Sequence, residues 1–258
     1  MRWAVLGAVL GSLVAGLAFA PATWLAASLS GATGQRLLLA DARGTVWQGS
    51  AVLVLTGGEG SQDASALPGR LHWTLGFKGM ALALQARHAC CINGELVLRL
   101  LPALTGLRVE LPAVQGPIGQ WPAAWLVGLG TPWNTIRPSG SLQLSSTGLS
   151  VESVQGRWRF NGQAVLELGS MASRLSTLPV LGSYRLQLQG ETAGGDATAV
   201  QLSTISGALQ LSGNGQWAAS KLRFSGQASA AEGAEAALNN LLNIIGRRKG
   251  ALSLFSIG

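Results

Sequence analysis

Charged and titratable residues are scarce in this sequence of 258 residues. Asp, Glu, Lys and Arg make up 11% of the chain, about half of the usual share, and there are two histidines and one tyrosine. Acid–base catalysis and metal binding draw mainly on these residue types. Neither a Gly-x-Ser-x-Gly turn nor a His-Glu-x-x-His motif occurs. We therefore expect no enzyme, and no catalytic residue, cofactor or metal.

Cysteine is equally rare, because Cys90 and Cys91 are the only two and are adjacent. A bridge between neighbours encloses no long loop, so a disulfide that stabilises the fold in that way is excluded. Together with His88 they offer three ligands, fewer than a structural zinc site uses. We expect both cysteines to serve as small apolar residues at the edge of a strand.

The net charge of +7 arises from scattered basic residues, with one cluster at Arg247-Arg248-Lys249. Such a charge suits nucleic acid or anionic lipid. No DNA- or RNA-binding motif accompanies the cluster. We therefore expect no nucleic-acid partner.

Glycine, apolar residues and tryptophan are abundant. The chain has 36 Gly, nine Trp and 48% hydrophobic residues, a composition that suits a sheet protein with many turns rather than a disordered one. Large aromatic side chains fill cores, and Trp is also enriched at membrane surfaces and interfaces.

The N-terminal region carries no charge from Trp3 to Gln35. Trp3–Ala20 would span about 27 Å as a helix, close to the hydrocarbon thickness of a bilayer of about 30 Å. Arg2 places the N-terminus in the cytoplasm and the rest of the chain across the membrane. We therefore interpret residues 1–30 as a cytoplasmic stub and transmembrane anchor whose membrane contacts are Trp3, Leu6, Val9, Leu10, Leu13, Val14, Leu17, Phe19 and Trp24.

A cleaved signal peptide is the alternative for this region, because Ala18-Phe19-Ala20 is the kind of triplet that signal peptidase reads. Pro21 follows it directly, however. Proline has no N–H and a fixed φ, so it fits poorly in an extended protease subsite. We therefore expect the segment to remain attached.

From residue 31 onward the apolar residues alternate with polar ones, as in strands. Leu37–Trp47 and Ser50–Thr56 are predicted to form a hairpin that turns at Gln48-Gly49, with Trp47 in the core. Residues 57–66 read as a loop. The next predicted strands are Leu71–Leu75, Met80–Arg87, Glu95–Leu100 and Leu107–Leu111.

The middle of the chain, residues 120–139, combines prolines with Trp121, Trp125 and Trp133. Pro122–Leu126 is predicted to be a short helix with proline in its first turn, and Thr131–Pro138 to be irregular. The segment either joins two half-sheets, residues 31–119 and 140–258, or is a surface on which the three tryptophans bind a partner.

The second half contains an internal repeat. Gly140–Ser145 matches Gly207–Ser212, and Arg159–Ala164 matches Arg223–Ala228 in the same order. The period of about 65 residues favours a duplicated meander that extends one sheet. A helix with one apolar face then follows at Ala234, Leu238, Leu241, Leu242 and Ile245, and Leu252–Ile257 can form a last strand.

Four segments together resemble the type II secretion system protein N family: Gly44–Gly49, Leu126–Thr135, Leu178–Tyr184 and Thr204–Gly215. The resemblance implies a single-pass inner-membrane protein with a periplasmic domain that is an accessory part of the secretion assembly. It supplies no catalytic residue.

We therefore predict a mainly β protein: an N-terminal transmembrane helix, then an elongated, mostly antiparallel, curved sheet over 31–258 with an internal repeat and one C-terminal helix. The predicted role is structural. The expected partners are inner-membrane platform proteins, the outer-membrane secretin and the membrane. The alternative is a periplasmic lipid-handling β-groove, because runs such as Val52–Leu55 leave much apolar surface to cover. No other small-molecule ligand is expected.

Overall fold

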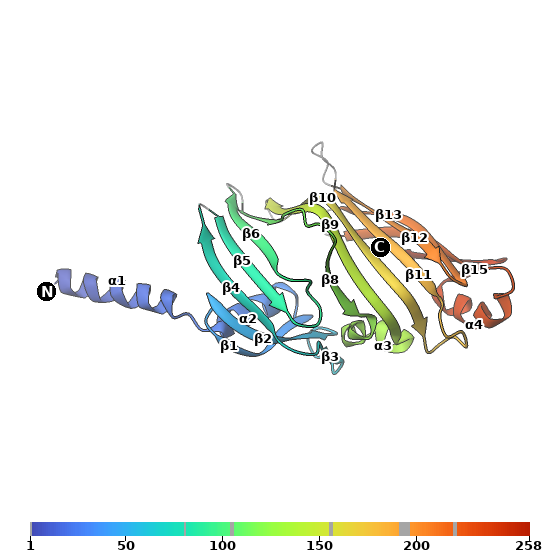
Figure 1. The fold of residues 1–258 in the computed structure, drawn as a ribbon, viewed down its shortest axis with the longest axis horizontal. Coiled ribbons are helices and arrows are strands. Elements are labelled where there is room, and N and C mark those ends of the chain that lie inside the picture. The colour runs from blue at the N-terminus through green and yellow to red at the C-terminus, as the bar shows by residue number, and fades with distance from the viewer. Residues whose placement is uncertain (1, 80, 104–105, 155–156, 191–196, 219–220) are drawn as a thin grey trace.

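The computed structural model describes residues 2–79, 81–103, 106–154, 157–190, 197–218 and 221–258. Short helices precede, interrupt and follow one large sheet (Figure 1). The helices are α1 (Arg2–Ala18), α2 (Ala22–Ala32), the 3-10 helix η1 (Ala123–Leu129), α3 (Trp133–Ile136) and α4 (Glu235–Ile245). The strands are β1 (Leu37–Gly44), β2 (Gln48–Thr56), β3 (Ala64–Ala66), β4 (Leu71–Lys78), β5 (Ala81–His88), β6 (Leu96–Ala103), β7 (Gly106–Leu111), β8 (Pro117–Pro122), β9 (Pro138–Val154), β10 (Arg157–Ser173), β11 (Gly182–Gly190), β12 (Ala197–Ser206), β13 (Leu209–Ala218), β14 (Lys221–Ala230), β15 (Arg247–Lys249) and β16 (Leu252–Ile257).

The strands form one curved, open, antiparallel sheet of 16 strands. Its main order is β1-β2-β4-β5-β6-β7-β9-β10-β11-β12-β13-β14-β16-β15, while β3 pairs with β2 and β8 pairs with β9. Most neighbours in the sheet are also neighbours in the sequence. Because β7 pairs with β9, the sheet runs from residues 31–119 into residues 140–258 without a break. The predicted mainly β, antiparallel architecture is confirmed.

Alternation along the strands gives the sheet one apolar face. Paired residues share a face, and successive pairs such as Leu39 with Leu53, Leu84 with Leu98, and Leu166 with Leu186 place leucines on the same side. The opposite side carries pairs such as Glu167 with Arg185, which form a salt bridge of 2.8 Å. We call the two sides the apolar face and the polar face.

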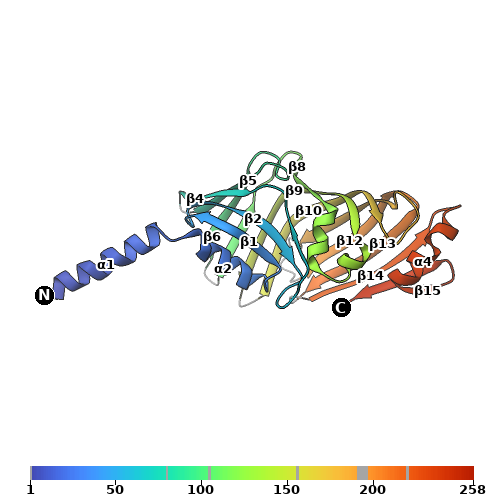
Figure 2. The same ribbon diagram turned by 90° about the horizontal axis from the view of Figure 1, so that it is seen from below.

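The N-terminal core lies where α2 covers the apolar face of the first strands. Ala22 of α2 is buried with Leu39, Ala51 and Trp73, and Leu25, Ala26 and Leu29 pack around them. Figure 2 shows α2 and α4 at opposite ends of the sheet. Trp73, on β4, is the large aromatic residue of this core and is 3% exposed.

The C-terminal core lies under α4. Leu238, Leu241 and Leu242 of the predicted helix are all buried, as their spacing of three and four residues requires, and the helix contacts β14, β15 and β16. Tyr184 is buried in the same core and donates a hydrogen bond of 3.0 Å to the carbonyl of Leu209. Burial raises the pKa of Tyr184, so its hydroxyl stays protonated and remains a donor.

The first hairpin turns three residues earlier than the sequence suggested. Its turn is Thr45–Trp47, after Gly44 with φ 88°, and Gly49 lies inside β2, paired with Gly44. A Cβ on Gly49 would overlap the indole ring of Trp73. The prediction was wrong because this glycine is needed for packing and not for the turn.

Trp47 was predicted to be core, but it is only half-buried, whereas Trp73 is buried. The Trp47 indole Nε1 donates a hydrogen bond of 2.8 Å to the carbonyl of Leu17 in α1. Trp47 therefore lies where α1 meets the sheet. Met80, the predicted first residue of a strand, lies outside the described residues, and β5 begins at Ala81.

The middle segment is more ordered than expected. A short helix does follow Pro122, but it is the 3-10 helix η1 and extends to Leu129. Thr131–Pro138 was predicted to be irregular, yet α3 forms one turn there. Pro132 directly precedes this turn, at a position where a missing N–H costs no helical hydrogen bond. Arg137, with φ 45°, ends it before Pro138.

The repeated motifs fall on matching hairpins, β9–β10 and β13–β14. Their first glycines, Gly140 and Gly207, have φ 119° and 125°, a region that other residues rarely adopt. A Cβ on either would collide with backbone atoms of the adjacent segment. The same conformational requirement thus explains the glycine in both copies.

Candidate functional site

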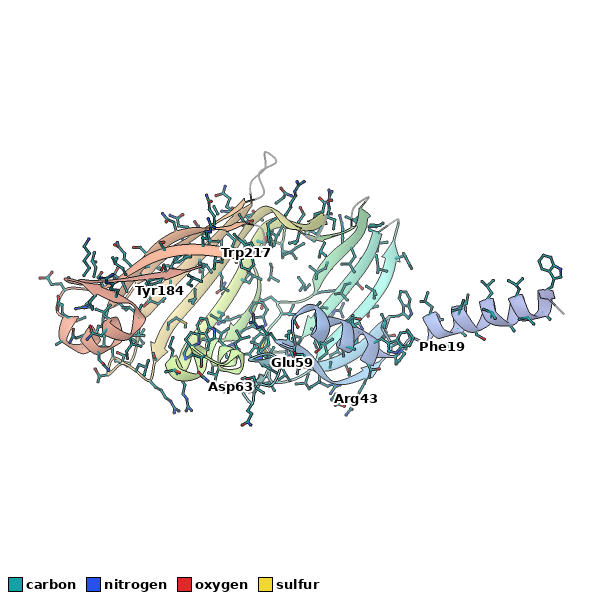
Figure 3. All side chains as sticks on the ribbon, turned by 180° about the vertical axis from the view of Figure 1, so that it is seen from behind. Phe19, Arg43, Glu59, Asp63, Tyr184 and Trp217 are labelled. Atoms are coloured by element: carbon teal, nitrogen blue, oxygen red, sulfur yellow. A yellow bond between two sulfur atoms is a disulfide. The ribbon has the colours of Figure 1, made fainter. Side chains whose placement is uncertain are left out.

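One side of the segment 120–139 contacts the first half of the sheet. The Trp125 indole donates a hydrogen bond of 3.0 Å to the carbonyl of Ser65 in β3. Asn134 donates one of 3.0 Å from Nδ2 to the carboxylate of Asp63. A Cβ on Gly128 would overlap the carbonyl of Leu55, so η1 packs directly on the backbone of β2. Figure 3 shows Asp63 near this joint.

The other side of the segment contacts the second half. Trp121 pairs with Leu142 across β8 and β9 and packs against the C-terminal core, in which Ala123 is fully buried. The hydroxyl of Ser173 donates a hydrogen bond of 2.7 Å to the carbonyl of Ile136. The segment therefore contacts both halves of the sheet, as its interpretation as a joint requires.

The three predicted interface residues, Trp121, Trp125 and Trp133, are all half-buried. The first two have partners inside the molecule. Each also keeps exposed surface that a partner protein can cover, so partner binding by the three tryptophans stays a prediction.

Alanine substitutions separate the two roles of the tryptophans. We expect Trp121→Ala and Trp125→Ala to lower the melting temperature, because each removes packing or a hydrogen bond that joins the two halves. We expect Trp133→Ala to keep the melting temperature and to lower affinity for another secretion component by about 2 kcal/mol if it is a binding residue. Melting curves and pull-down measure both. Unchanged binding by three stable variants would remove the segment as an interface.

The two cysteines do not stay apolar and unpaired, because the structure joins Cys90 and Cys91 in a disulfide directly after β5. Cys91 is buried and Cys90 exposed, and the Sγ of Cys90 lies 3.3 Å from Nδ1 of His88. The possible metal-ligand atoms of His88, Cys90 and Cys91 all lie within 4.8 Å of one another. Metal ligation by Cys requires a thiolate, and sulfurs bonded to each other supply none. The disulfide form therefore does not fit a metal ion.

His88 is buried, and its Nε2 has no hydrogen-bond partner among the described residues. Burial, with a smaller contribution from the charge of His72, holds the pKa of His88 below its ordinary value of 6.5. The folded protein therefore favours the neutral ring.

This burial predicts a pH dependence of stability. Below pH 6.5 the unfolded chain binds a proton at His88 that the folded chain resists, so the free energy of unfolding should fall as pH is lowered from 7 toward 5. The slope due to one such group is at most about 1.4 kcal/mol per pH unit. Denaturant titrations at several pH values should show a flatter profile for His88→Asn. His72→Asn is the control and should change the profile less, since it leaves the buried His88 ring in place and removes only the smaller contribution to its pKa. An unchanged slope in His88→Asn would contradict the prediction.

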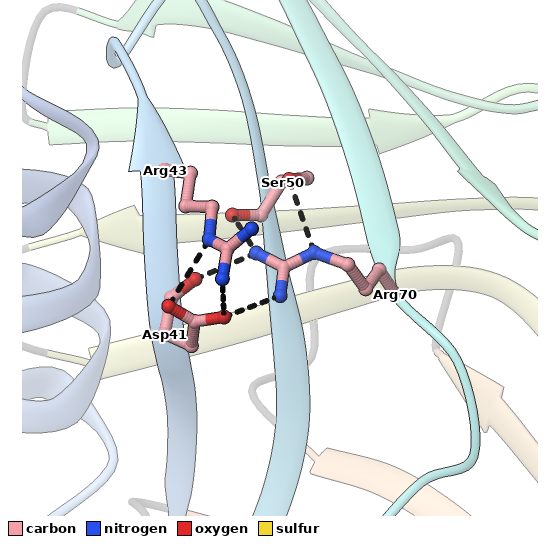
Figure 4. Close-up of polar contacts among 4 residues, drawn as sticks. All are labelled: Asp41, Arg43, Ser50 and Arg70. Carbon is pink, nitrogen blue, oxygen red and sulfur yellow. Dashed lines mark hydrogen bonds and ion pairs between the residues drawn. The ribbon is translucent and has the colours of Figure 1, made fainter.

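A polar cluster on β1 holds the edge of the sheet (Figure 4). Asp41 adopts φ 49° at a bulge and accepts a hydrogen bond of 2.7 Å from Nη1 of Arg70. Arg43 also contacts its carboxylate, and Nε of Arg70 donates to the hydroxyl of Ser50 at 3.2 Å. The hydrogen bonds from Arg70 and then Arg43 hold the pKa of Asp41 below its usual value. Sequence reasoning missed this cluster because its members come from three separate strands or their flanks.

A hollow of about 810 Å³ lies over the polar face of β12 to β14. It is lined by Gln201, Asn214, Gln216, Lys221, Arg223 and Ser225, together with Ala199, Val200 and Gly215. None of these residues is a carboxylate or a histidine, the usual general acids and bases. The hollow offers polar and basic contacts but no evident acid–base pair.

The predicted anchor residues lie on α1, on α2 and between them. Helix α1 stands away from the sheet (Figure 1), and the nine predicted membrane-contacting side chains are between 54% and 87% exposed. Helix α1 has 17 residues. Among the residues that the structure describes, no helix is both long and apolar enough to cross a membrane.

Comparison with known proteins decides the family. The family model described as type II secretion system (T2SS), protein N, matches residues 35–254, which is most of the chain. The chain belongs to the type II secretion system protein N family. No curated protein and no solved structure matches it.

Because it belongs to this family, the protein is a component of the type II secretion system, a membrane-associated machinery for protein transport. The segments that carried the resemblance are mainly structural. Gly44–Gly49 forms the first turn, Leu126–Thr135 lies in the joint, and Thr204–Gly215 carries the turn at Gly207. In Leu178–Tyr184, Leu181 donates a backbone hydrogen bond of 2.7 Å to Met171.

Proposed function

We propose that the protein is an accessory structural component of the inner-membrane assembly of the type II secretion system. It links that assembly to periplasmic parts during export of folded proteins across the outer membrane. The observation that carries this role is the shape of the chain: an exposed apolar helix at one end and a long sheet that extends away from it (Figure 1). The proposed partners are platform proteins and the outer-membrane secretin.

We propose further that α1 is the membrane anchor, with the N-terminus in the cytoplasm and the sheet in the periplasm. Its exposed side chains support this, as does a group of exposed aromatic residues where α1 meets the sheet. Phe19 and Trp24 are largely exposed, and half-buried Trp47 lies 6.5 Å, ring to ring, from exposed Phe77. Figure 3 shows Phe19 at the sheet end of α1. Aromatic residues are enriched at the level of lipid headgroups.

The anchor is tested by substitutions at two exposed positions of α1. Leu10→Arg with Leu13→Arg should release the chain from the membrane fraction, because charges near the bilayer centre cost about 2.5–3.5 kcal/mol each. Leu10→Ala with Leu13→Ala is the matched control and should stay bound, because alanine introduces no charge. If the double arginine variant fractionated with the membrane as fully as the control, α1 would not be the anchor.

We also expect the N-terminal segment to remain attached. Ala20 is buried, its carbonyl accepts a hydrogen bond of 2.9 Å from Val46, and Pro21 bridges to Thr45. The peptide bond between Ala20 and Pro21 is therefore held against the edge of the folded sheet. N-terminal sequencing of the membrane-extracted protein should begin at or near Met1, and a chain that begins at Pro21 would show that cleavage occurs.

The role in secretion is tested by deleting the gene for this protein and, separately, by cross-linking. Deletion should lower export of a folded substrate without lowering its synthesis. Photo-reactive residues at Arg248 on β15, far from α1, should capture a secretion component, whereas Leu10 in α1 should capture lipid or membrane proteins. Normal export without the chain would contradict the proposed role, even if α1 proved to be an anchor.

We propose that the protein is not an enzyme and needs no cofactor. The support is chemical: His88 is buried, and acids such as Glu167 and Glu152 form ion pairs with Arg185 and Arg108. The hollow on the polar face has no acid or histidine in its lining.

A further inference from the structure

A strip of half-buried apolar side chains crosses the apolar face in the middle of the sheet. Leu82 pairs with Leu100, Leu100 with Val109, and Val109 with Val151, so these residues form a row across β5, β6, β7 and β9. Leu98 and Leu111 lie beside them on the same face, two residues along their strands. We call these six residues the apolar strip: Leu82, Leu98, Leu100, Val109, Leu111 and Val151.

The strip lies outside the two hydrophobic cores. None of the six side chains belongs to either core cluster, and all are half-buried. Helix α2 packs on β1 and β2 before the strip, and α4 packs on β14, β15 and β16 at the far end of the sheet. At β13 and β14 the face is filled by its own residues, because the Phe224 ring lies where a Cβ on Gly213 would be.

The strip continues to the base of α1. Phe77, 74% exposed, pairs with Leu82 and lies 6.5 Å, ring to ring, from Trp47. The Trp47 indole in turn donates its hydrogen bond to Leu17 at the end of α1. An apolar path therefore leads from the proposed anchor through two aromatic side chains onto the strip.

The size and direction of the strip favour one kind of occupant. Together with Phe77 on β4, the strip crosses four strand spacings of about 4.8 Å, roughly 19 Å in all. One leaflet of a bilayer, half of about 30 Å, is the length of one acyl chain. The strip runs across the strands, whose backbone groups are already paired, so a peptide strand would find no free N–H or C=O there. An acyl chain needs none.

We propose that the apolar strip holds an acyl chain of a phospholipid drawn from the membrane next to α1. The proposal rests on α1 being the anchor, as proposed above. The net charge of +7 favours an anionic headgroup. Burial of the strip by a hydrocarbon chain supplies the binding free energy.

Photo-cross-linking in the full-length, membrane-resident chain tests this. A photo-reactive phenylalanine analogue is placed at Leu98 or Leu100 on the strip, and at Val97 or Arg99, their neighbours on the polar face. Val97 is the matched control because it is also apolar and half-buried. After irradiation, mass spectrometry should find phospholipid adducts at least tenfold more abundant at Leu98 and Leu100 than at Val97 and Arg99. A probe at Leu10 in α1 reports membrane insertion in the same preparation.

Each outcome supports or overturns the strip as a lipid site. Equal lipid labelling on both faces, no lipid adduct at Leu98 and Leu100, or adducts with a second copy or another protein would each overturn it. Lipid labelling at Leu10 alone would leave the anchor standing while the strip fails. A missing adduct at Leu10 would reject the anchor, and with it the proposal that the lipid comes from the membrane next to α1. Lipid extraction from the purified full chain, with about one phospholipid per chain expected, gives a second measurement that needs no substitution.

Discussion

Trp73→Ala should lower the free energy of unfolding by about 3–5 kcal/mol, the cost of removing a large aromatic side chain from a core. Trp73 is 3% exposed, its ring covers Gly49 on the next strand, and it lies under α2. Its Nε1 also donates a hydrogen bond of 3.1 Å to the carbonyl of Val46, which the substitution leaves without that partner. Denaturant unfolding of the full chain in detergent, followed by tryptophan fluorescence and circular dichroism, measures the change.

Trp47→Ala is the control, because it removes the same side chain from a half-buried position in the turn, two residues before Gly49 in the sequence. We expect less than half of the Trp73 effect, since much of the Trp47 ring is already in solvent or lipid. Equal losses for the two variants would show that Trp47 is core after all and that the assignment of Trp73 as the main aromatic residue of this core is wrong.

Gly207→Ala should destabilise by about 2–6 kcal/mol, the sum of a disfavoured backbone and an overpacked contact. Gly207 has φ 125°, and a Cβ there would overlap Gly182 and the carbonyl of Leu181. Because backbone atoms cannot rotate away as a side chain can, the turn between β12 and β13 has to move. The hydrogen bond of 2.9 Å from Leu209 to Leu181 should be lost with it. Thermal melting and hydrogen exchange at Leu209 report both effects.

Alanine substitutions at two further glycines separate the backbone contribution from the packing contribution. Gly233 has φ 81° and open space around it, so Gly233→Ala should show the backbone term alone, about 1–2 kcal/mol. Gly76 has open space and no left-handed φ, so Gly76→Ala should be neutral or slightly stabilising. If Gly207→Ala cost no more than Gly233→Ala, the collision with Gly182 would not be real.

Local patterns in the sequence were enough for the fold class. Alternation such as Leu142 and Leu144 against Gln143 predicts strands with one apolar face, since strand side chains point to opposite sides in turn. The helical spacing of Leu238, Leu241 and Leu242 likewise identified the face that α4 buries. The family, too, followed from short motifs read together.

Long-range contacts decided the rest, because no periodicity records which distant residues meet. Gly49 looked like a turn glycine, but the Trp73 side chain packs against it from the neighbouring strand. The Asp41–Arg70 pair and the Trp125–Ser65 hydrogen bond join residues 29 and 60 positions apart. The apolar strip could not be predicted from the sequence for the same reason. Each strand showed its own leucines, but which ones lie beneath a helix is set by how the sheet and helices pack. The sequence alone therefore determined the strands, the helix faces and the family, and the tertiary structure alone decided which apolar surface lies outside the two cores.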